Sequence, residues 1–256
     1  MARQILLELD SFECTTKPKE NIKCKILNMS GLKVAIIGAN GKIGRLLVDY
    51  LKQDKTHFGT PLAIVRNAEQ QEYFTKEVKI NASLTSIEHA SVKEVAAAIK
   101  GYDAMVFTAG AGGKGVERLF TVDLDGCTKA LEACEMAGVN RFIVVSALKA
   151  EDRDFWWDIP GLREYYIAKR AADHDVRHSD LAWTILQPGW LKDEPSIGKF
   201  TPLDQIDEKI KGDKSIGRQD VALFIKEALL HEKETLHKTL SLVNGDVPVD
   251  EFISTL

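Results

Sequence analysis

Three residues in the second half of the chain have side chains suited to moving a proton, namely Ser146, Tyr165 and Lys169. Tyr165 and Lys169 are spaced one helical turn apart, so on a helix both project from the same face. In reduction of a carbonyl, the tyrosine hydroxyl would donate a proton to the developing alkoxide, and the ammonium would stabilise the remaining phenolate. Ser146 would hydrogen-bond the substrate oxygen and hold it for hydride attack. This pattern predicts hydride-transfer chemistry, with Lys169 also placed to bind a ribose hydroxyl.

A glycine-rich turn earlier in the chain could hold a dinucleotide that carries the hydride. It lies between a short apolar run at 32–37 and an amphipathic run at 43–51. A turn in this context aims free backbone N–H groups and a helix dipole at a pyrophosphate. Gly38 would permit the tight turn, Gly41 the close approach of phosphate, and Gly44 close packing of helix on strand. The candidate cofactor residues of the turn are Gly38, Asn40, Gly41, Lys42, Ile43 and Gly44.

The residues that follow the second expected strand indicate which dinucleotide is bound. A cofactor without a 2′-phosphate is usually met there by an acidic residue that accepts from the ribose hydroxyls. This chain has Arg66 and Asn67 instead. A guanidinium can grip a phosphate with two hydrogen bonds and stack on adenine, so NADP(H) is favoured over NAD(H). The alternative is that Arg66 is an ordinary solvated loop residue.

A second glycine-rich loop, at 109–115, follows the fourth expected strand at the same edge of the sheet. Close approach of backbone to a ligand would explain so many glycines, and this makes Ala109 and Gly110 further candidates for contact with the cofactor. A mobile surface loop without a ligand is an equally good explanation of this composition.

These residues need a frame of strands and helices that brings them to one edge. Apolar runs predict strands at 32–37, 62–65, 78–80 (the weakest), 105–108, 141–145, 183–186 and 239–243. Helical spacing of apolar residues predicts helices over 43–51, from Ser91 with a capping box to 101, and over 123–137, 161–178 and 220–230. Such alternation implies an α/β fold, a Rossmann-type doubly wound parallel sheet with helices on both faces.

The chain divides into two parts at about residue 30. Residues 1–30 have weak periodicity and read as an N-terminal extension, of which 1–28 looks dispensable for the domain, whereas 31–256 form the Rossmann domain. The irregular, polar stretch 190–215 is expected to form a small lid or substrate subdomain at the C-terminal edge of the sheet.

Composition favours a small-molecule partner. The chain of 256 residues is 45% hydrophobic and 28% charged, as in an ordinary globular protein, and no apolar run approaches the roughly 20 residues that cross a bilayer. A net charge of −4 gives no reason to expect nucleic acid or an anionic membrane, and the default location is the cytoplasm.

The four cysteines show no C-x-x-C spacing, and His174 and His178 lack a third ligand, so no metal is expected.

Several segments together resemble one known family, the short-chain dehydrogenase/reductase superfamily in its atypical NAD(P)-binding branch, with NmrA-like and flavin- or biliverdin-reductase-like members. The resemblance runs from about residue 32 to 252 and rests on 38–44, Val122-Asp123-Leu124-Asp125-Gly126, Val145-Ser146, Tyr165-Tyr166-Ile167-Ala168-Lys169, Gln187-Pro188-Gly189-Trp190 and Ile216-Gly217-Arg218-Gln219-Asp220-Val221-Ala222.

The resemblance implies roles for residues that spacing alone does not single out. Pro188 and Gly189 would run beside the nicotinamide, and Ser83 and Leu84 stand where the branch has an Asp-Leu pair that contacts adenine. The chain departs from the branch at Ser83 and also at Gln187, where the branch usually has Arg. Because some members bind NADP and act as sensors without turnover, the resemblance supports cofactor binding more strongly than catalysis.

Three tryptophans lie near the expected site in the sequence: Trp156, Trp157 and Trp190. They would suit a flat apolar or aromatic substrate, or else form a hydrophobic plug.

The predicted function is an NADP-dependent oxidoreductase that reduces a small carbonyl, quinone or flavin-like molecule. The alternatives are a non-catalytic sensor of the NADPH/NADP ratio, and an epimerase or dehydratase of the sugar-nucleotide type. The oligomeric state is left open between monomer and homodimer.

Overall fold

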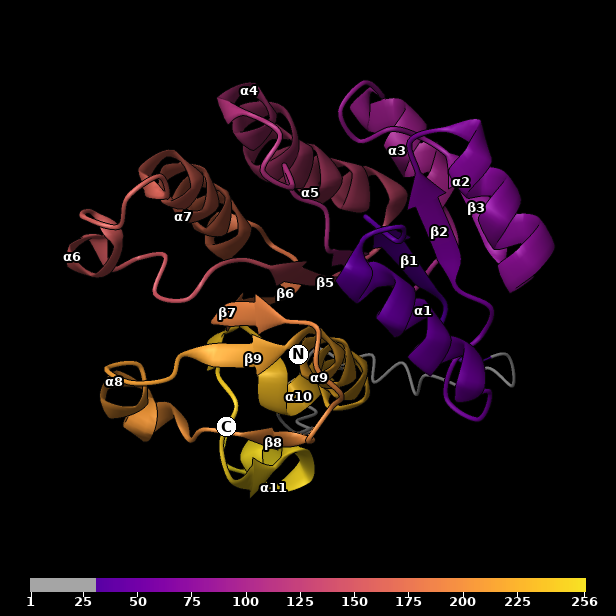
Figure 1. Cartoon of the computed structure of the whole chain (residues 1–256). Coiled ribbons are helices and arrows are strands. Elements are labelled where there is room, and N and C mark those ends of the chain that lie inside the picture. The colour runs from indigo at the N-terminus through magenta and orange to yellow at the C-terminus, as the bar shows by residue number, and fades with distance from the viewer. Residues whose placement is uncertain (1–30) are drawn as a thin grey trace, which may run out of the picture.

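The computed structural model describes residues 31–256, and its centre is one parallel sheet between two layers of helices (Figure 1). The strands of this sheet are β1 (Val34–Ile37), β2 (Leu62–Val65), β3 (Asn81–Leu84), β4 (Ala104–Phe107), β5 (Arg141–Val145), β6 (Ala182–Pro188) and β10 (Lys238–Leu242). The longer helices are α1 (Lys42–Gln53), α3 (Val92–Ile99), α5 (Asp125–Ala137), α7 (Arg163–His178) and α9 (Arg218–Leu230).

Short elements fill the connections. The short helices are α2 (Ala68–Glu72), α4 (Val116–Arg118), α6 (Arg153–Trp156), α8 (Ile206–Lys209), α10 (Glu232–Thr235), α11 (Val249–Ser254), the 3₁₀ turn η3 (Leu203–Gln205) and two π-helical turns, η1 (Tyr73–Val78) and η2 (Leu119–Leu124). Two small sheets pair β7 (Trp190–Lys192) with β9 (Ser215–Gly217) and β8 (Lys199–Phe200) with β11 (Val247–Pro248).

The strand order of the main sheet is β10-β6-β5-β4-β1-β2-β3, and every neighbouring pair is parallel. The chain therefore winds outward from β1 in both directions, which confirms the predicted doubly wound Rossmann-type fold. The β1–β4 junction is the point where the winding reverses. In such sheets a crevice opens there, at the carboxyl ends of the strands.

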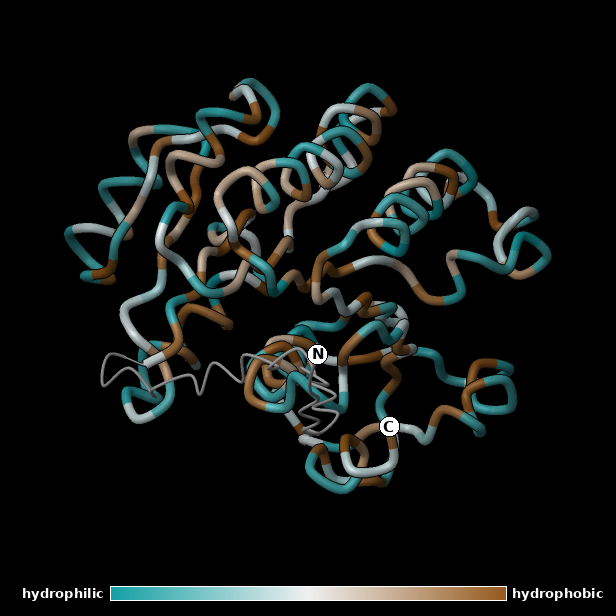
Figure 2. The backbone as a smooth tube through the Cα atoms, turned by 180° about the vertical axis from the view of Figure 1, so that it is seen from behind, coloured by the Kyte–Doolittle hydropathy of each residue, from teal (hydrophilic) through white to brown (hydrophobic). Residues whose placement is uncertain are grey.

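Alternation along the strands divides the core into two halves. Val34 and Ile36 face the layer of α1 and α9, whereas Ala35 and Ile37 face the layer of α3, α5 and α7. Figure 2, which shows the chain from behind, places many of its hydrophobic stretches in the strands between these layers. Both faces of the sheet are therefore covered, as continuous apolar runs in parallel strands require.

Most predicted elements match the structure to within a few residues, and the capping box of Ser91 with Glu94 is present. The third strand is a correction. The prediction placed it at 78–80, but Val78 ends the π-helical turn η1 and β3 begins at Asn81. The run at 78–80 is apolar because Val78 and Ile80 pack beneath this edge of the sheet, not because it is extended.

The structure describes only part of what the sequence predicted about the organisation of the chain. The predicted N-terminal extension over 1–30, including the stretch 1–28 that was expected to be dispensable, lies outside the described residues, as do Cys14 and Cys24. Within 31–256, Cys127 and Cys134 are buried and unbridged, and no helix there is long and apolar enough to cross a membrane. The stretch 190–215 contributes to both small C-terminal sheets, and its function as a lid stays a prediction.

Close packing at the start of α1 gives a first testable prediction. A Cβ on Gly44 would lie 2.4 Å from the carbonyl oxygen of Gly38, so Gly44→Ala must displace the turn. We expect a loss of about 1–3 kcal/mol in the free energy of unfolding, measured by urea denaturation. Gly212→Ala is the control, because a Cβ there meets nothing closer than 3.8 Å. Equal stability of the two variants would contradict this account of Gly44.

Candidate functional site

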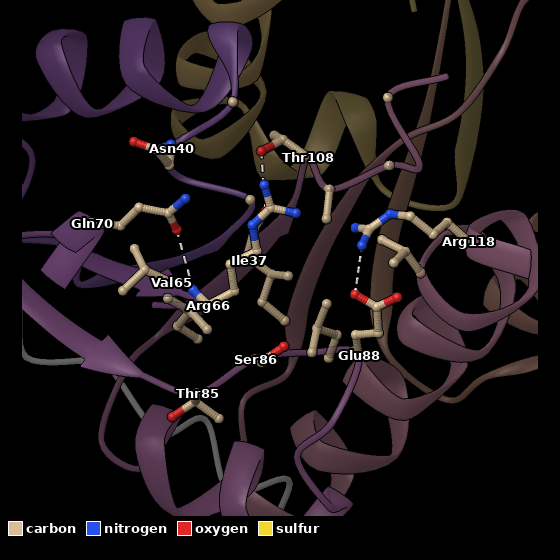
Figure 3. Close-up of a pocket in the computed structure, with 18 residues that line it drawn as sticks. Ile37, Asn40, Val65, Arg66, Gln70, Thr85, Ser86, Glu88, Thr108 and Arg118 are labelled. Atoms are coloured by element: carbon tan, nitrogen blue, oxygen red, sulfur yellow. Dashed lines mark hydrogen bonds and ion pairs between the residues drawn. The ribbon is translucent and has the colours of Figure 1, made fainter. Parts of the chain in front are cut away.

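A pocket of about 360 Å³ opens at the point where the sheet reverses its winding (Figure 3). Its size falls within the roughly 300–1,000 Å³ of small-molecule sites. It is lined by the carboxyl ends of β1, β2 and β4 and by the loop after β3, and the lining includes Gly38, Asn40, Gly41, Arg66, Ala109 and Gly110. Six of the predicted cofactor residues are thus brought together from three separate loops.

The glycine turn provides the floor of this pocket. Gly38 has φ +84°, and a Cβ there would lie 2.5 Å from the backbone nitrogen of Ala109, so the turns after β1 and β4 can touch only because this residue is glycine. A Cβ on Gly41 would come within 3.1 Å of the Gly38 carbonyl oxygen. Because α1 begins next, at Lys42, the unpaired N–H groups of its first turn face the pocket side.

Not every residue of the turn lines the pocket. Ile43 is buried, and Gly44 serves the close packing of α1 described above. The Lys42 ammonium forms an ion pair with Asp193. Asp193 also accepts from Arg218 at 2.7 Å, so these three residues join the start of α1 to the segment after β7 and to α9. The Lys42 side chain is thus engaged by Asp193, and its contact with the cofactor stays a prediction.

At the end of β2 the Arg66 side chain is exposed and extends into the pocket, as Figure 3 shows. Its backbone N–H donates to Gln70 Oε1 at 3.3 Å, and Gln70 also lines the pocket. Asn67 has a structural role instead, because its side chain caps α2 by accepting from the Gln70 N–H at 2.9 Å. Arg66 is therefore the residue of this pair whose side chain can meet a ligand.

An ion pair that the sequence did not reveal closes another side of the pocket. Arg118 donates to Glu88 at 2.7 Å, and both residues line the pocket. Glu88 also accepts from Thr121 at 3.1 Å. Figure 3 shows Arg118 and Glu88 facing each other across one side of the cavity. The carboxylate is thus engaged by its own partners, and the Arg66 guanidinium has no ion pair within residues 31–256.

The residues predicted to contact adenine, Ser83 and Leu84, end β3 beside the pocket without lining it. The Ser83 hydroxyl is hydrogen-bonded to that of Thr85 at 2.7 Å, and Leu84 is 50% exposed. The next residues, Thr85 and Ser86, line the pocket instead. The residues that line the pocket at this edge therefore lie two positions further along the chain than the predicted pair, and the contact of Ser83 and Leu84 with adenine stays a prediction.

Tyr165 and Lys169 lie on α7 as predicted, with the Lys169 ammonium 5.8 Å from the centre of the Tyr165 ring. Lys169 is 5% exposed, pairs with Asp123 at 3.0 Å and donates to the Val145 carbonyl at 3.1 Å. Asp123 in turn accepts from the Ala111 N–H at 2.7 Å, and a Cβ on Gly110 would lie 3.2 Å from it. Asp123 therefore connects the lysine to the loop that lines the pocket.

The electrostatics of this group favour a charged lysine and a protonated tyrosine. Burial alone would lower the pKa of Lys169, but the Asp123 carboxylate outweighs it and raises that pKa above its usual value. Burial raises the pKa of the Tyr165 hydroxyl, and Lys169 offsets only part of this effect. At neutral pH the tyrosine is therefore a proton donor rather than a base.

Ser146 follows β5 as predicted, but its hydroxyl has a partner of its own. It donates to Asp173 Oδ2 at 2.7 Å, and the Gln187 side-chain amide donates to the same oxygen at 3.1 Å. Gln187 also donates to Glu151, which pairs with Arg177. Burial raises the pKa of Asp173 to about 6, although these hydrogen bonds and the charge of Lys169 lower it in part. The serine is thus held by a buried carboxylate.

The three tryptophans were expected either to contact a substrate or to form a hydrophobic plug, and the structure separates them. Trp156 is fully buried, stacks on Tyr166 with ring centres 5.5 Å apart, and donates to the Ala150 carbonyl, so it is a core residue and its predicted substrate contact is wrong. Trp157 and Trp190 are 43% and 58% exposed. Trp157 packs beneath the Arg163 guanidinium, 4.4 Å from its ring centre. Only these two can meet a substrate.

Pro188 and Gly189 end β6 next to the strand that carries Ser146. The Pro188 carbonyl accepts from the Leu148 N–H at 3.1 Å. A Cβ on Gly189 would lie 1.9 Å from the Lys214 carbonyl oxygen, so only glycine fits there. The backbone of both residues is therefore fixed at the same edge of the sheet as Tyr165 and Lys169.

Comparison with known proteins agrees with this geometry. Residues 38–232 match the model of a family described as NAD(P)H-binding. The chain belongs to this NAD(P)H-binding family. It is 61% identical over 228 residues to the UPF0659 protein YMR090W of Saccharomyces cerevisiae, covering 89% of this chain and 100% of that protein.

Two further relatives carry names of different activities. An uncharacterized sugar epimerase of Bacillus subtilis, YhfK, is 40% identical over 226 residues, covering 88% of this chain and 100% of that protein. The structure of the oxidoreductase ylbE from Lactococcus lactis superposes with a TM-score of 0.75 at 30% identity, covering 88% of this chain and 96% of that one. The chain is accordingly an NAD(P)-binding protein of the Rossmann type, in agreement with the resemblance to the atypical short-chain branch.

The pocket of this NAD(P)H-binding protein fits a dinucleotide. The glycines leave backbone exposed where side chains would obstruct a phosphate, and Arg66 and Gln70 offer donors at the end of β2. Sequence reasoning missed Asp123, Asp173, Glu88 and Arg118 as parts of the site. Asp123 stood in a quoted family motif without a role, and the π-helical turn η2, which sets its position, has no simple apolar period.

The raised pKa of Asp173 predicts a pH dependence of stability. Because its pKa is about 6 in the folded chain and about 4 in an unfolded one, ionising it opposes folding. This penalty is absent below about pH 4 and complete above about pH 6. Asp173→Asn removes it, so the variant should gain up to about 3 kcal/mol relative to wild type between pH 4 and pH 7.

Urea denaturation of both proteins across this range measures the gain, and Asp49→Asn on the exposed side of α1 is the control. A constant difference between Asp173→Asn and wild type at all pH values would mean that Asp173 titrates normally in the folded chain.

Proposed function

We propose that this protein is an NADP(H)-dependent reductase that transfers hydride to a small carbonyl, quinone or flavin-like molecule. The observation that carries the proposal is the partly buried Tyr165 ring beside the ion pair of Lys169 with Asp123, whose charged atoms are 3.0 Å apart. Asp123 is in turn bound to the loop of the pocket. A proton donor and a cofactor site are thus held by one continuous set of contacts.

The residues have separate tasks in this proposal. NADPH supplies the hydride when bound. Tyr165 donates the proton to the substrate oxygen, and its raised pKa suits reduction because the hydroxyl stays protonated at neutral pH. Lys169, kept charged by Asp123, stabilises the phenolate that is left. The Ser146 hydroxyl donates to Asp173, so the proton comes from Tyr165 and Ser146 helps to shape the site.

The preference for NADP(H) over NAD(H) is supported by the charges at the end of β2. Arg66 faces the pocket and has no acidic partner among residues 31–256, and the acidic residue of the lining, Glu88, is held by Arg118. A 2′-phosphate would meet an unpaired guanidinium, and a bare ribose would find no free carboxylate there.

The role of Tyr165 is tested by Tyr165→Phe. We expect NADPH affinity within a few-fold of wild type and a fall in kcat of roughly 10²–10⁴ on an accepted carbonyl, because the variant keeps the ring and loses the acid. NADPH oxidation is followed by absorbance in a screen of aldehydes, ketones, quinones and flavins. Tyr166→Phe is the matched control, since it loses the neighbouring hydroxyl from a ring that packs on Trp156.

Two outcomes would count against parts of the proposal. Full activity of Tyr165→Phe would reject this acid, while leaving hydride transfer to a flavin or quinone, which needs no such donor. A wild type that binds NADPH and turns over nothing in the screen would favour the sensor of the NADPH/NADP ratio.

Cofactor preference is tested by Arg66→Ala. The variant should lose about 1.5–3 kcal/mol of NADP⁺ binding, the worth of a charge-assisted contact, and much less of NAD⁺ binding. Calorimetric titration with both cofactors measures the two losses. Arg170→Ala, an exposed arginine on α7, controls for the change in net charge. A wild type that prefers NAD⁺ would overturn the assignment.

The name of the Bacillus subtilis relative supports a second candidate, epimerase chemistry. An epimerase would take a hydride and return it, so the cofactor would be unchanged after turnover and no absorbance of NADPH would be lost. Chromatography of products from nucleotide sugars, with NADP⁺ recovered unreduced, would distinguish this reaction from net reduction.

A further inference from the structure

Within residues 31–256, a cation at the substrate end of the site has no carboxylate partner. Lys214 directly precedes β9, and its main chain is tied to the start of β7, since its carbonyl accepts from the Trp190 N–H at 2.9 Å. Packing of the same carbonyl against Gly189, which directly follows β6, leaves no room for a side chain there. Lys214 is therefore held at the edge where Ser146 follows the neighbouring strand β5.

The ammonium of Lys214 lies between two aromatic rings. Its Nζ is 4.8 Å from the centre of the Trp190 ring and 5.6 Å from that of Phe155. Trp190 is 58% exposed, and Phe155 is partly buried. Phe155 belongs to the same apolar cluster as Tyr165 and approaches Tyr166 edge-on at 6.4 Å. The three side chains thus offer flat apolar surface and one positive charge on the side of the site where Tyr165 lies.

The charge of Lys214 is not neutralised within residues 31–256, where no carboxylate lies within 4 Å of it. Three acidic side chains that precede it in the chain pair with other cations, namely Asp213 with Lys192, Asp207 with Lys149, and Glu208 with Lys211. Stacking on aromatic faces holds an ammonium in place and leaves its hydrogen-bond donors free.

We propose that Lys214, Trp190 and Phe155 form a subsite for a substrate that carries an anionic group on a flat, unsaturated body. This inference rests on the proposed function and names its substrate class. The rings contact the flat body, and the Lys214 ammonium binds the anionic group, a carboxylate being the simplest example. The subsite orients the substrate with its reducible group towards Tyr165.

A matched pair of probes tests the subsite without any need for turnover. 2-Naphthoate and 2-naphthylmethanol differ in charge and share the same ring, and their binding to the NADP⁺-saturated protein is measured by calorimetry. We expect 2-naphthoate to bind at least about tenfold more tightly, as one hydrogen bond to a charged group implies. Lys214→Met should abolish the difference, and Lys214→Arg should retain most of it.

Two further variants test which side chains cause the binding of the probes and the preference for 2-naphthoate. Trp190→Leu should weaken both probes, because both use the ring. Lys199→Met removes an exposed lysine from β8 that forms no ion pair within residues 31–256, and should leave the preference unchanged. Equal binding of the two probes to wild type, or an unchanged preference in Lys214→Met, would overturn the proposal.

A kinetic pair separates this inference from the proposed function. If the protein reduces aldehydes, Lys214→Met should raise KM for 4-formylbenzoate by about tenfold and leave kcat and the constants for benzaldehyde unchanged, as loss of uniform binding requires. Selective binding of 2-naphthoate without reduction of any aldehyde, ketone, quinone or flavin would support the subsite and reject the reductase. Reduction of both aldehydes with the same KM would reject the subsite and support the reductase.

Discussion

The ion pair of Lys169 with Asp123 is the interaction on which the site depends. Both groups are almost fully buried, and a charge left alone in such surroundings would cost several kcal/mol. The pair joins α7 to the π-helical turn η2, and each partner makes one more contact, Lys169 with the Val145 carbonyl and Asp123 with the Ala111 N–H. Losing either partner would therefore disturb the tyrosine, the end of β5 and the pocket loop together.

The site consequently has two halves of opposite character. The half at the end of β2 is open and presents an exposed arginine, whereas the half at the end of β5 is closed and holds its polar groups in hydrogen bonds. An open, charged half suits a large cofactor that arrives from water. A closed half suits a proton donor whose pKa must be kept away from its solution value, since burial is the main cause of that shift.

Sequence pattern was sufficient for the frame and for the edge where the site lies. Buried strands such as β5 and amphipathic helices such as α7 show their burial in local periodicity. β3 was misplaced because it is an edge strand whose four residues are all exposed or half-buried, while the apolar residues before it belong to a π-helical turn. The glycine turn and Arg66 could be identified because each directly follows a buried strand, which is a local feature of the sequence.

The parts of the site that sequence did not reveal are contacts between distant segments. Asp173 was an unremarkable helix residue until Ser146 and Gln187 were seen to converge on it from β5 and β6. Asp123 and Arg118 acquire their partners through η2 and the turn after β3, and Trp156 is core because Tyr166 covers it. Residue type and spacing do not predict which of these side chains will be in contact, because their partners lie far away in the sequence.

The face of the sheet covered by α1 and α9 has a consequence for how the chain folds. Leu47 and Leu51 of the first helix share one core with Phe224 and Ile225 of a helix close to the C-terminus. While the protein is being synthesised, the earlier half of this core lacks the cover of α9 until that helix, Arg218–Leu230, has left the ribosome. Stable packing of this face must therefore wait for α9, and a chain that stops before α9 would leave apolar surface open to aggregation.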